Sequence, residues 1–455
     1  MSPMRLVVVG GGVAGLAGAR AARLEATAAG LALDITLLEG SDRLGGKIRT
    51  ELVGGLPLEW GPDSFIAAKP RGRDLAVELG LEQELVPTSP AARRTYLLTA
   101  GALRPLPPGL VMGIPTGPSP LIAAARRGIL TPGAAARAGI EPLLPGGLDL
   151  HRSAREVARR RLGNEAARAL VESLVLGVFG APADRIGAGW AFPWARGQRS
   201  LMAAAAARPR PKGPVFLGIR GGMSRLVDAL VESLEDVEVR TECPVESIGS
   251  ANGGFALGTA SGTVAADAVL LAVPAPSAAT LVHPVAPEAA RPLASIEYTA
   301  SAVVLLRFAE ASLGRPLDGS GYLVAPEEGD VVAACSFLPV KWPHLSDRRG
   351  VWLRGVVVDR SALELPDEGL KHRAAVEVST AIGAHGGAEE LLLRRWEQAL
   401  PIYGPGLEET VRAARSQLPP RVALAGAFID GVGIPDCART GEQAARSLVR
   451  ALAAG

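Results

Sequence analysis

The pattern of hydrophobic and polar positions along the first fifty residues predicts a strand, a helix and a second strand. An apolar run at residues 5–9, rich in valine, has the length and composition of a buried strand. A Gly-rich turn follows, and an Ala- and Leu-rich helical pattern then continues to about residue 29. A second apolar run at residues 33–38 ends at the acidic residue Glu39. Strand, Gly-rich turn, helix, strand and acid occur in this order in units that bind dinucleotides.

The Gly-rich turn has the spacing GxGxxG, with glycine at positions 10, 12 and 15. The first glycine permits the tight turn, the second lets the backbone approach a pyrophosphate, and the third allows the helix to pack closely on the strand. The unpaired N–H groups and the positive dipole end of the helix favour phosphate there. Glu39 can accept hydrogen bonds from both ribose hydroxyls. An ordinary turn of another α/β protein is the alternative. The predicted contacts in the turn are Gly10, Gly11, Gly12, Val13, Ala14 and Gly15.

The residues after the second strand favour FAD over NAD as the dinucleotide. Glu39 is followed four residues later by Arg43, and then by Gly45, Gly46 and Lys47. Arg43 can reach a phosphate, and the two glycines let the backbone pass close to a cofactor. An acid, an arginine and a glycine pair in this order are typical of FAD-binding proteins of the amine-oxidase type.

A second candidate cofactor loop consists of Gly61, Pro62, Asp63 and Ser64. Gly and Pro fix the shape of a loop, and Asp63 and Ser64 supply polar groups. A plain loop is the alternative. The basic residues Arg71 and Arg73 follow shortly afterwards, and they either form a solvated surface or bind a substrate carboxylate through charge-assisted hydrogen bonds.

The remaining strand and helix patterns predict an α/β fold with a discontinuous Rossmann-type domain. Residues 237–272 carry strand patterns, in which Val245 could lie against an adenine edge. Near the C-terminus a strand leads into a Gly-rich turn and a final helix, so the backbone of Val432, Gly433 and Ile434 could meet the pyrimidine end of a flavin. Strand patterns between residues 301 and 358 predict a mixed, largely antiparallel second sheet.

Three domains follow from these patterns. We predict an FAD-binding domain at residues 1–75, 215–285 and 405–455, and a substrate-binding domain at residues 76–100, 186–214 and 286–404. A helical insertion at residues 101–185 would complete the chain. Its Pro- and Gly-rich first part is either a long loop or a set of short helices that rest on a membrane, with arginines at the polar border.

Composition narrows the class of protein further. A chain of 455 residues is long enough for two or three domains, and a net charge of +2 gives no sign of nucleic-acid binding. Three scattered cysteines predict neither a disulfide framework nor a metal site. We expect no signal peptide and no membrane span, and therefore a cytoplasmic protein or one bound peripherally to the inner face of the membrane.

Motifs along the whole chain resemble those of the flavoprotein protoporphyrinogen oxidases of haem biosynthesis and their relatives that oxidise coproporphyrinogen III. The most specific are Gly-Pro-Asp-Ser-Phe at residues 61–65 and Val-Gly-Ile-Pro-Asp-Cys at residues 432–437. The chain departs from the family at residues 177–182, where a usual Gly-Asp-Pro is missing, and after Tyr403, where a customary His is missing. The other matching motifs lie at residues 38–50, 221–226, 341–343 and 395–403.

The resemblance implies the oxidation of protoporphyrinogen IX to protoporphyrin IX, with coproporphyrinogen III as the alternative substrate. A hydride would pass from the tetrapyrrole to flavin N5, and dioxygen would reoxidise the flavin. No catalytic side chain is expected, because the later steps towards an aromatic ring run strongly downhill. Trp396 is a further implied FAD contact, and a homodimer is expected from the family only. The rivals are an FAD amine oxidase, a carotenoid desaturase, or a flavin-free binding protein.

A tetrapyrrole requires a flat, apolar pocket. Leu323, Val324 and Trp342 are the candidates that would enclose the macrocycle, with ordinary core packing of the second sheet as the alternative. Arg71 or Arg73 would bind a propionate. Cys437 lies next to the predicted flavin turn, but such a cysteine is more often a buried apolar residue, so we expect non-covalent FAD.

Overall fold

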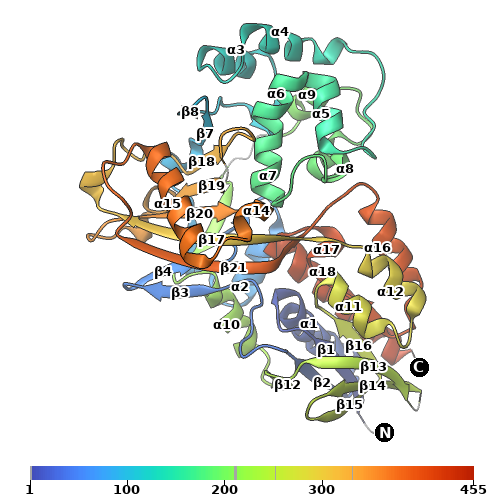
Figure 1. Cartoon of the computed structure of the whole chain (residues 1–455). Coiled ribbons are helices and arrows are strands. Elements are labelled where there is room, and N and C mark those ends of the chain that lie inside the picture. The colour runs from blue at the N-terminus through green and yellow to red at the C-terminus, as the bar shows by residue number, and fades with distance from the viewer. Residues whose placement is uncertain (1–2, 210–212, 252, 330, 455) are drawn as a thin grey trace. The chain divides into compact units, whose positions relative to one another are not determined.

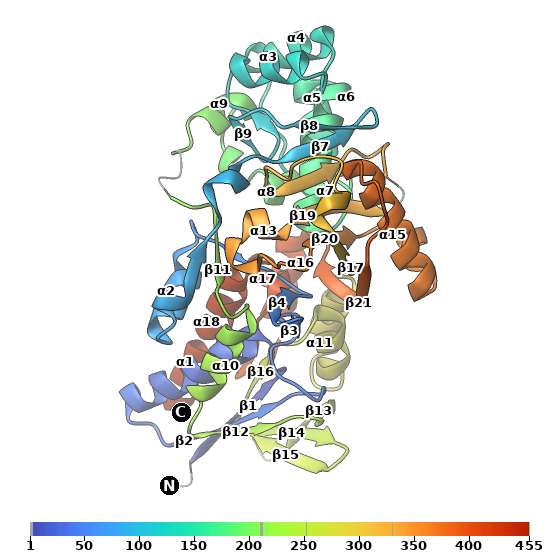
Figure 2. The same ribbon diagram turned by 90° about the vertical axis from the view of Figure 1, so that its left-hand side faces the viewer.

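The computed structural model describes residues 3–209, 213–251, 253–329 and 331–454. The chain divides into two compact units (Figures 1 and 2). The first unit comprises Met1–Pro87, Gly213–Glu297 and Leu407–Gly455, and the second comprises Thr88–Lys212 and Tyr298–Gly406. Residues 76–87 and 286–297 therefore belong with the first unit rather than with the predicted substrate domain. The predicted helical insertion groups with the antiparallel sheet instead of forming a third unit.

A parallel five-stranded sheet forms the centre of the first unit, as the strand–turn–helix pattern predicts. Its order is β12-β2-β1-β16-β22, and every neighbouring pair is parallel. Parallel strands are covered on both faces and read as continuous apolar runs, and the side chains of Leu6 and Val8 in β1 are indeed fully buried. The strands are β1 (Met4–Val9), β2 (Leu33–Leu38), β12 (Val237–Arg240), β16 (Ala268–Leu271) and β22 (Val422–Leu424).

Two long helices, α1 (Val13–Ala29) and α18 (Ile434–Ala453), lie side by side in both views of the first unit (Figures 1 and 2). Glycine makes this contact possible, because a Cβ on Gly441 would lie 1.9 Å from the carbonyl oxygen of Ala14. The contact joins the N-terminal and C-terminal parts of the chain. Together with the pairing of β22 and β16, it places the two cofactor motifs from opposite ends of the sequence in one unit.

Shorter elements complete the first unit. A hairpin, a three-stranded sheet of order β5-β11-β6 and a three-stranded antiparallel sheet of order β13-β14-β15 supplement the central sheet. Their strands are β3 (Thr50–Val53), β4 (Leu56–Glu59), β5 (Phe65–Ile66), β6 (Leu85–Pro87), β11 (Phe216–Ile219), β13 (Val245–Ala251), β14 (Gly254–Thr259) and β15 (Gly262–Ala266). The remaining helices are α2 (Pro70–Glu78), α10 (Ser224–Glu232), α11 (Ala275–Val282), α12 (Pro287–Ala294), α16 (Leu407–Ser416) and α17 (Ala427–Asp430).

A seven-stranded sheet of order β21-β17-β20-β19-β18-β7-β8 forms the core of the second unit. All its pairs are antiparallel except β18 with β7, so the predicted mixed, largely antiparallel sheet is confirmed. Helix α15 (Asp367–Ile382) buries Leu370, Ala374 and Val378 against this sheet. The strands are β7 (Tyr96–Thr99), β8 (Ala102–Pro105), β17 (Tyr298–Phe308), β18 (Gly321–Val324), β19 (Val332–Phe337), β20 (Val351–Val357) and β21 (Glu390–Pro401).

The helical part of the second unit contains short helices and a small hairpin rather than one long loop. A buried ion pair anchors it, in which Arg161 Nε lies 2.7 Å from Glu141 Oε1. No helix in the described ranges has both the length and the apolar character that a membrane span requires. The elements are β9 (Leu110–Val111), β10 (Ile114–Pro115), α3 (Pro118–Arg126), α4 (Pro132–Gly139), α5 (Ala154–Leu162), α6 (Asn164–Ala166), the π-helix η4 (Ala167–Glu172), α7 (Ser173–Phe179), α8 (Ala188–Ala191) and α9 (Leu201–Ala206). Two further short helices of the second unit, α13 (Leu338–Lys341) and α14 (Arg360–Leu363), follow strands β19 and β20 of the sheet.

Candidate cofactor site

The GxGxxG turn joins β1 to α1, and its glycines serve different purposes. Gly10 has φ +103°, and a Cβ there would lie 2.7 Å from the carbonyl oxygen of Ala272. A Cβ on Gly15 would lie 1.9 Å from the carbonyl oxygen of Gly10. A Cβ on Gly12, by contrast, would meet no atom within 4 Å. The chain itself therefore requires Gly10 and Gly15, whereas Gly12 faces the open space in which a pyrophosphate would lie at the start of α1.

The loop that contains Arg43, Gly45 and Gly46 lies directly beside this turn. Gly45 N–H donates to the carbonyl oxygen of Gly11 at 2.8 Å, and a Cβ on Gly46 would lie 3.3 Å from Gly12 Cα. The Arg43 guanidinium donates to the carbonyl oxygens of Leu44, Gly46 and Ile48. The structure thus gives Arg43 a role in shaping the loop, which the sequence analysis did not predict. Its contact with a phosphate stays a prediction.

Glu39 lies at the end of β2, where it meets both the turn and a neighbouring segment. Its Oε2 accepts the N–H of Gly11 at 2.6 Å, and its Oε1 accepts the N–H and the hydroxyl of Ser41 at 2.8 and 2.7 Å. The backbone of Glu39 also pairs with Arg240 and Cys243, two residues before Val245. The two predicted adenosine contacts, Glu39 and Val245, therefore come from paired segments of the first unit.

The Gly61–Ser64 segment packs against the loop of Lys47. A Cβ on Gly61 would lie 1.8 Å from the carbonyl oxygen of Lys47, so no other residue fits there without a shift of the backbone. Ser64 donates its hydroxyl to Asp63 Oδ1 at 2.8 Å. The structure thus brings the glycine turn, the Arg43 loop and the Gly61 loop together, as their predicted common role requires.

Glu59 is a residue of this region that the sequence analysis missed. Its side chain is buried and accepts the N–H of Met223 at 2.6 Å and the hydroxyl of Thr50 at 3.0 Å. It thereby joins the hairpin before Gly61 to the turn before α10. The sequence contained one signal for this role, an acidic residue at the end of the apolar strand β4. A carboxylate buried there needs hydrogen-bond partners, so it could have been expected to connect neighbouring segments.

The turn before α18 is held by a buried carboxylate. Gly431 has φ +145°, and Cβ atoms on Gly431 and Gly433 would lie 2.8 and 3.0 Å from Asp436 Oδ2. Asp436 forms an ion pair with Lys69, which lies just before α2. Asp436 therefore fixes the backbone of Val432, Gly433 and Ile434 at the N-terminus of a 20-residue helix, a position that favours the electronegative edge of a flavin.

Burial shifts the pKa values of two groups beside this turn in opposite directions. In both cases the shift disfavours the charged form of the group. Loss of solvent raises the pKa of the Cys437 thiol to about 12, so the group is a neutral thiol at physiological pH. Loss of solvent lowers the pKa of the Lys47 ammonium to about 8. A neutral, buried thiol is a poor nucleophile, which favours non-covalent FAD.

Two other predicted residues, Trp396 and Arg71, have partners within their own units. Trp396 belongs to β21 of the second unit, where it pairs with Ser301. Arg71 forms ion pairs with Glu78 and with the buried Glu442, at 2.5 Å in each case. These contacts favour a structural role for Arg71 over the predicted contact with a propionate.

The remaining substrate candidates differ in how exposed they are to solvent. Val324 and Trp342 are only 5% and 2% exposed, which favours the alternative of ordinary core packing. Leu323 is half-buried and packs against α7, because a Cβ on Gly177 would lie 2.7 Å from its Cδ2. Arg73 is largely exposed and lies 3.9 Å from Glu82.

The residues of the first unit fit FAD. A Cβ on Gly12 would meet no atom within 4 Å, so a pyrophosphate would have room there, and Glu39 at the end of β2 is where the ribose would bind. The start of α18 would present backbone N–H groups to the flavin. A family comparison agrees with this geometry, because the model of the flavin-containing amine oxidoreductases matches residues 13–449. The chain belongs to that family. Membership implies FAD as the cofactor and an oxidoreductase activity.

Individual relatives match almost the full length of the chain. The coproporphyrinogen III oxidase of Mycobacterium tuberculosis H37Rv is 33% identical over 99% of both chains, and that of Bacillus subtilis 168 is 30% identical over 96% of both. Human protoporphyrinogen oxidase is 29% identical over 98% of both chains. A crystal structure from Exiguobacterium sp. 255-15, provisionally described as a protoporphyrinogen oxidase, has a TM-score of 0.87 at 30% identity and 99% coverage of both chains. Cyclohexylamine oxidase from Brevibacterium oxydans IH-35A shares the fold, with a TM-score of 0.71 at 17% identity over 99% of this chain and 100% of that chain.

Proposed function

We propose that this protein oxidises coproporphyrinogen III to coproporphyrin III, with FAD as the cofactor and dioxygen as the electron acceptor. The observation that carries the proposal is the full-length similarity, at 30–33% identity, to relatives named coproporphyrinogen III oxidase. This substrate replaces protoporphyrinogen IX, which the sequence analysis favoured. Both substrates are porphyrinogens of haem biosynthesis, so the class of reaction is unchanged.

The first unit supplies binding and orientation in this proposal. FAD would supply the hydride acceptor for a C–H bond of a methylene bridge. The turn at Gly12 and the carboxylate of Glu39 would bind the pyrophosphate and ribose. Asp436, held by Lys69, would orient the backbone at the start of α18 towards the flavin. Cys437 remains neutral and apolar there.

The distribution of histidine is consistent with a reaction that needs no proton-transfer side chain. Among the described residues of the first unit, the single histidine is His283, which is exposed just after α11. The histidines at 151, 372 and 385 of the second unit are also exposed, and His344 is half-buried with its ring centroid 6.2 Å from that of Trp342. The aromatic product makes the overall oxidation strongly favourable, so positioning is the main requirement on the protein.

Protoporphyrinogen IX is the second candidate substrate, because human protoporphyrinogen oxidase matches the chain at 29% identity. The test compares the two reduced substrates on purified, FAD-loaded protein, with porphyrin fluorescence as the readout and hydrogen peroxide as a second product. We expect kcat/KM for coproporphyrinogen III to be about tenfold higher. The opposite preference would favour the second candidate, and no porphyrin from either substrate would contradict the proposed function.

A further inference from the structure

A buried carboxylate and a lysine meet in the first unit, where α2 begins beside the start of α18. Lys69 is the residue before α2, and its ammonium pairs with Oδ2 of Asp436 in the first turn of α18. The side chain of Asp436 is only 8% exposed. A second cation, Arg439, lies 3.7 Å from Oδ1 of Asp436, so Lys69 makes the closer contact. The negative charge of a carboxylate that water hardly reaches is therefore balanced mainly by Lys69.

The packing of α2 on α18 holds this ion pair in place. A Cβ on Gly72 of α2 would lie 2.8 Å from Pro435 Cγ, so the two helices approach each other closely at this point. Further along the same pair of helices, Nη2 of Arg71 lies 2.5 Å from Oε1 of Glu442. These contacts hold the beginning of α2 against α18, so the ammonium of Lys69 stays beside its carboxylate.

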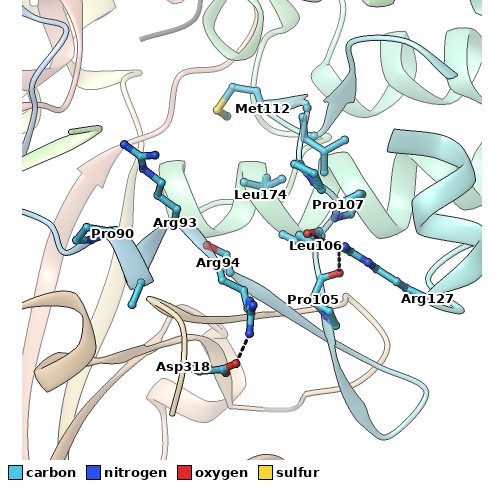
Figure 3. A pocket seen from close by; sticks show the side chains of 16 residues that line it. Pro90, Arg93, Arg94, Pro105, Leu106, Pro107, Met112, Arg127, Leu174 and Asp318 are labelled. Carbon is cyan, nitrogen blue, oxygen red and sulfur yellow. Dashed lines mark hydrogen bonds and ion pairs between the residues drawn. The ribbon is translucent and has the colours of Figure 1, made fainter. Parts of the chain in front are cut away.

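An exposed ion pair of the second unit shows why burial matters here. Arg94 and Asp318 pair in the lining of a cavity of about 980 Å³ (Figure 3), and their side chains are 54% and 43% exposed. Water and salt screen such a pair, so its charges have little effect beyond their immediate neighbours. Asp436 is buried, so its charge is screened much less. The wall of the cavity is formed by the 3-10 helix η2 (Pro90–Arg93), the loop at residues 105–113 and Leu174 of α7.

The thiol of Cys437 shows that the charges of the buried pair act on the turn before α18. Its Sγ lies 3.9 Å from each of two carbonyl oxygens of the turn at residues 431–433, which would meet the flavin. Burial is the main cause of the raised pKa of this thiol, and the charge of Asp436 raises the pKa further, whereas Lys47 and Lys69 lower it. Asp436 and Lys69 therefore have opposite electrostatic effects at the place where the flavin would bind.

We propose that Lys69 raises the reduction potential of the FAD bound at this turn by balancing the charge of Asp436. Two-electron reduction at neutral pH adds negative charge to the flavin, and a negative group nearby opposes that reduction. With Lys69 in place, the start of α18 presents the positive end of its dipole, whereas an unbalanced Asp436 cancels this effect. Lys69 is a positioning residue in this sense, because it acts on the flavin through Asp436. The inference rests on FAD as the cofactor and not on the identity of the substrate.

The test measures the midpoint potential of the bound flavin by anaerobic titration against a dye of known potential. In Lys69→Met the equilibrium constant for reduction should fall about tenfold, which lowers the potential by about 30 mV for a two-electron couple. Asp436→Asn should shift the potential in the opposite direction. The double variant should return to within about twofold of the wild-type equilibrium constant, because the two charges are removed together.

Lys69→Arg keeps the positive charge and should keep the wild-type potential. Arg73→Met is the matched control, because it removes a positive charge from α2 at a largely exposed side chain that lies 3.9 Å from Glu82. An unchanged potential in Lys69→Met would overturn the inference, as would an equal shift in Arg73→Met. Shifts of the same sign in Lys69→Met and Asp436→Asn would overturn it too, since a general disturbance of the turn would explain both. Comparison of Lys69→Met with Lys69→Arg decides the question even if Asp436→Asn fails to fold.

The potential is measured on FAD-loaded protein without any porphyrinogen, which separates this inference from the proposed function. A wild-type enzyme that oxidises neither porphyrinogen would contradict the proposed function, and the potentials of the variants would still decide the role of Lys69. Active wild-type enzyme with equal potentials in all the variants would overturn the role of Lys69 alone. Protein that binds no FAD would overturn the cofactor assignment and this inference together.

Discussion

The cofactor region of the first unit and the cavity of the second unit are built in opposite ways. In the first, backbone atoms approach each other so closely that only glycine fits, and the charged groups Arg43, Glu59 and Asp436 are engaged by the chain itself. In the second, side chains form the wall, and Arg93 is left exposed. A rigid backbone frame suits a cofactor that stays bound, whereas an exposed side chain such as that of Arg93 remains free to move.

The largest effect is expected from Gly15→Ala. A Cβ at this position would lie 1.9 Å from the carbonyl oxygen of Gly10, so β1 and α1 would have to move apart. We expect the variant to be purified without FAD and with a lower melting temperature. Absorbance of the purified protein measures the flavin content. Full flavin content would contradict the claim that backbone packing in this turn creates the cofactor site.

Arg71→Met should cost stability rather than substrate affinity. It removes the partner of Glu442, whose burial already raises the pKa of that carboxyl. Leaving a buried charge unpaired costs about 3 kcal/mol. Urea denaturation measures this loss. Arg73→Met is the control, with an expected change within about 0.5 kcal/mol, because Arg73 is largely exposed. A tenfold rise in KM with unchanged stability would instead restore Arg71 as a substrate residue.

Gly12→Ala tests the position of the pyrophosphate without disturbing the protein. The backbone at Gly12 is extended, with φ −72° and ψ 175°, and an added Cβ meets nothing within 4 Å. We expect an unchanged melting temperature of the FAD-free protein and a Kd for FAD that is about tenfold higher. If FAD affinity is unchanged, the pyrophosphate does not pass over this residue.

Lys47 should make FAD binding depend on pH. Burial lowers its pKa to about 8, so the ammonium loses its proton as pH rises from 7 to 9. FAD carries negative phosphates, so only the protonated lysine attracts it, and affinity should fall across this interval by a few-fold. Lys47→Met should bind FAD more weakly at pH 7 and with less dependence on pH. Flavin fluorescence measures both. Identical pH profiles for the two proteins would exclude this role.

Cys437→Ser should have the smallest effect. The thiol is neutral because burial raises its pKa to about 12, so it should form no bond to the flavin. Acid precipitation of the wild-type protein should release all the flavin. Flavin retained in the wild-type pellet and released from the serine variant would show covalent attachment.

The contrast between the two regions also explains how much could be predicted from the sequence. The parallel sheet, the glycine turn and the turn before α18 were predictable, because each depends on residues with special backbone geometry or on continuous apolar runs. Gly10, Gly15 and Gly61 have no substitute at their positions, so their spacing reveals the structure. The antiparallel sheet was predictable from another signal, namely the composition of its strands and the turn residues between them.

The substrate side was harder to predict because an arginine or a leucine has many uses. Arg71 was a candidate for a propionate, and its pairing with Glu442 depends on α18, more than 350 residues away in the chain. Val324 and Trp342 have the composition of a pocket but are buried in the core.

The most direct test of the central claim is a single-turnover experiment without oxygen. FAD-loaded protein is mixed with a slight excess of coproporphyrinogen III, and the flavin absorbance is followed. The account predicts that the yellow colour of the flavin is lost as the substrate is oxidised, and that it returns when air is admitted. Flavin that stays oxidised with coproporphyrinogen III, or that is reduced only by an amine such as cyclohexylamine, would contradict the account.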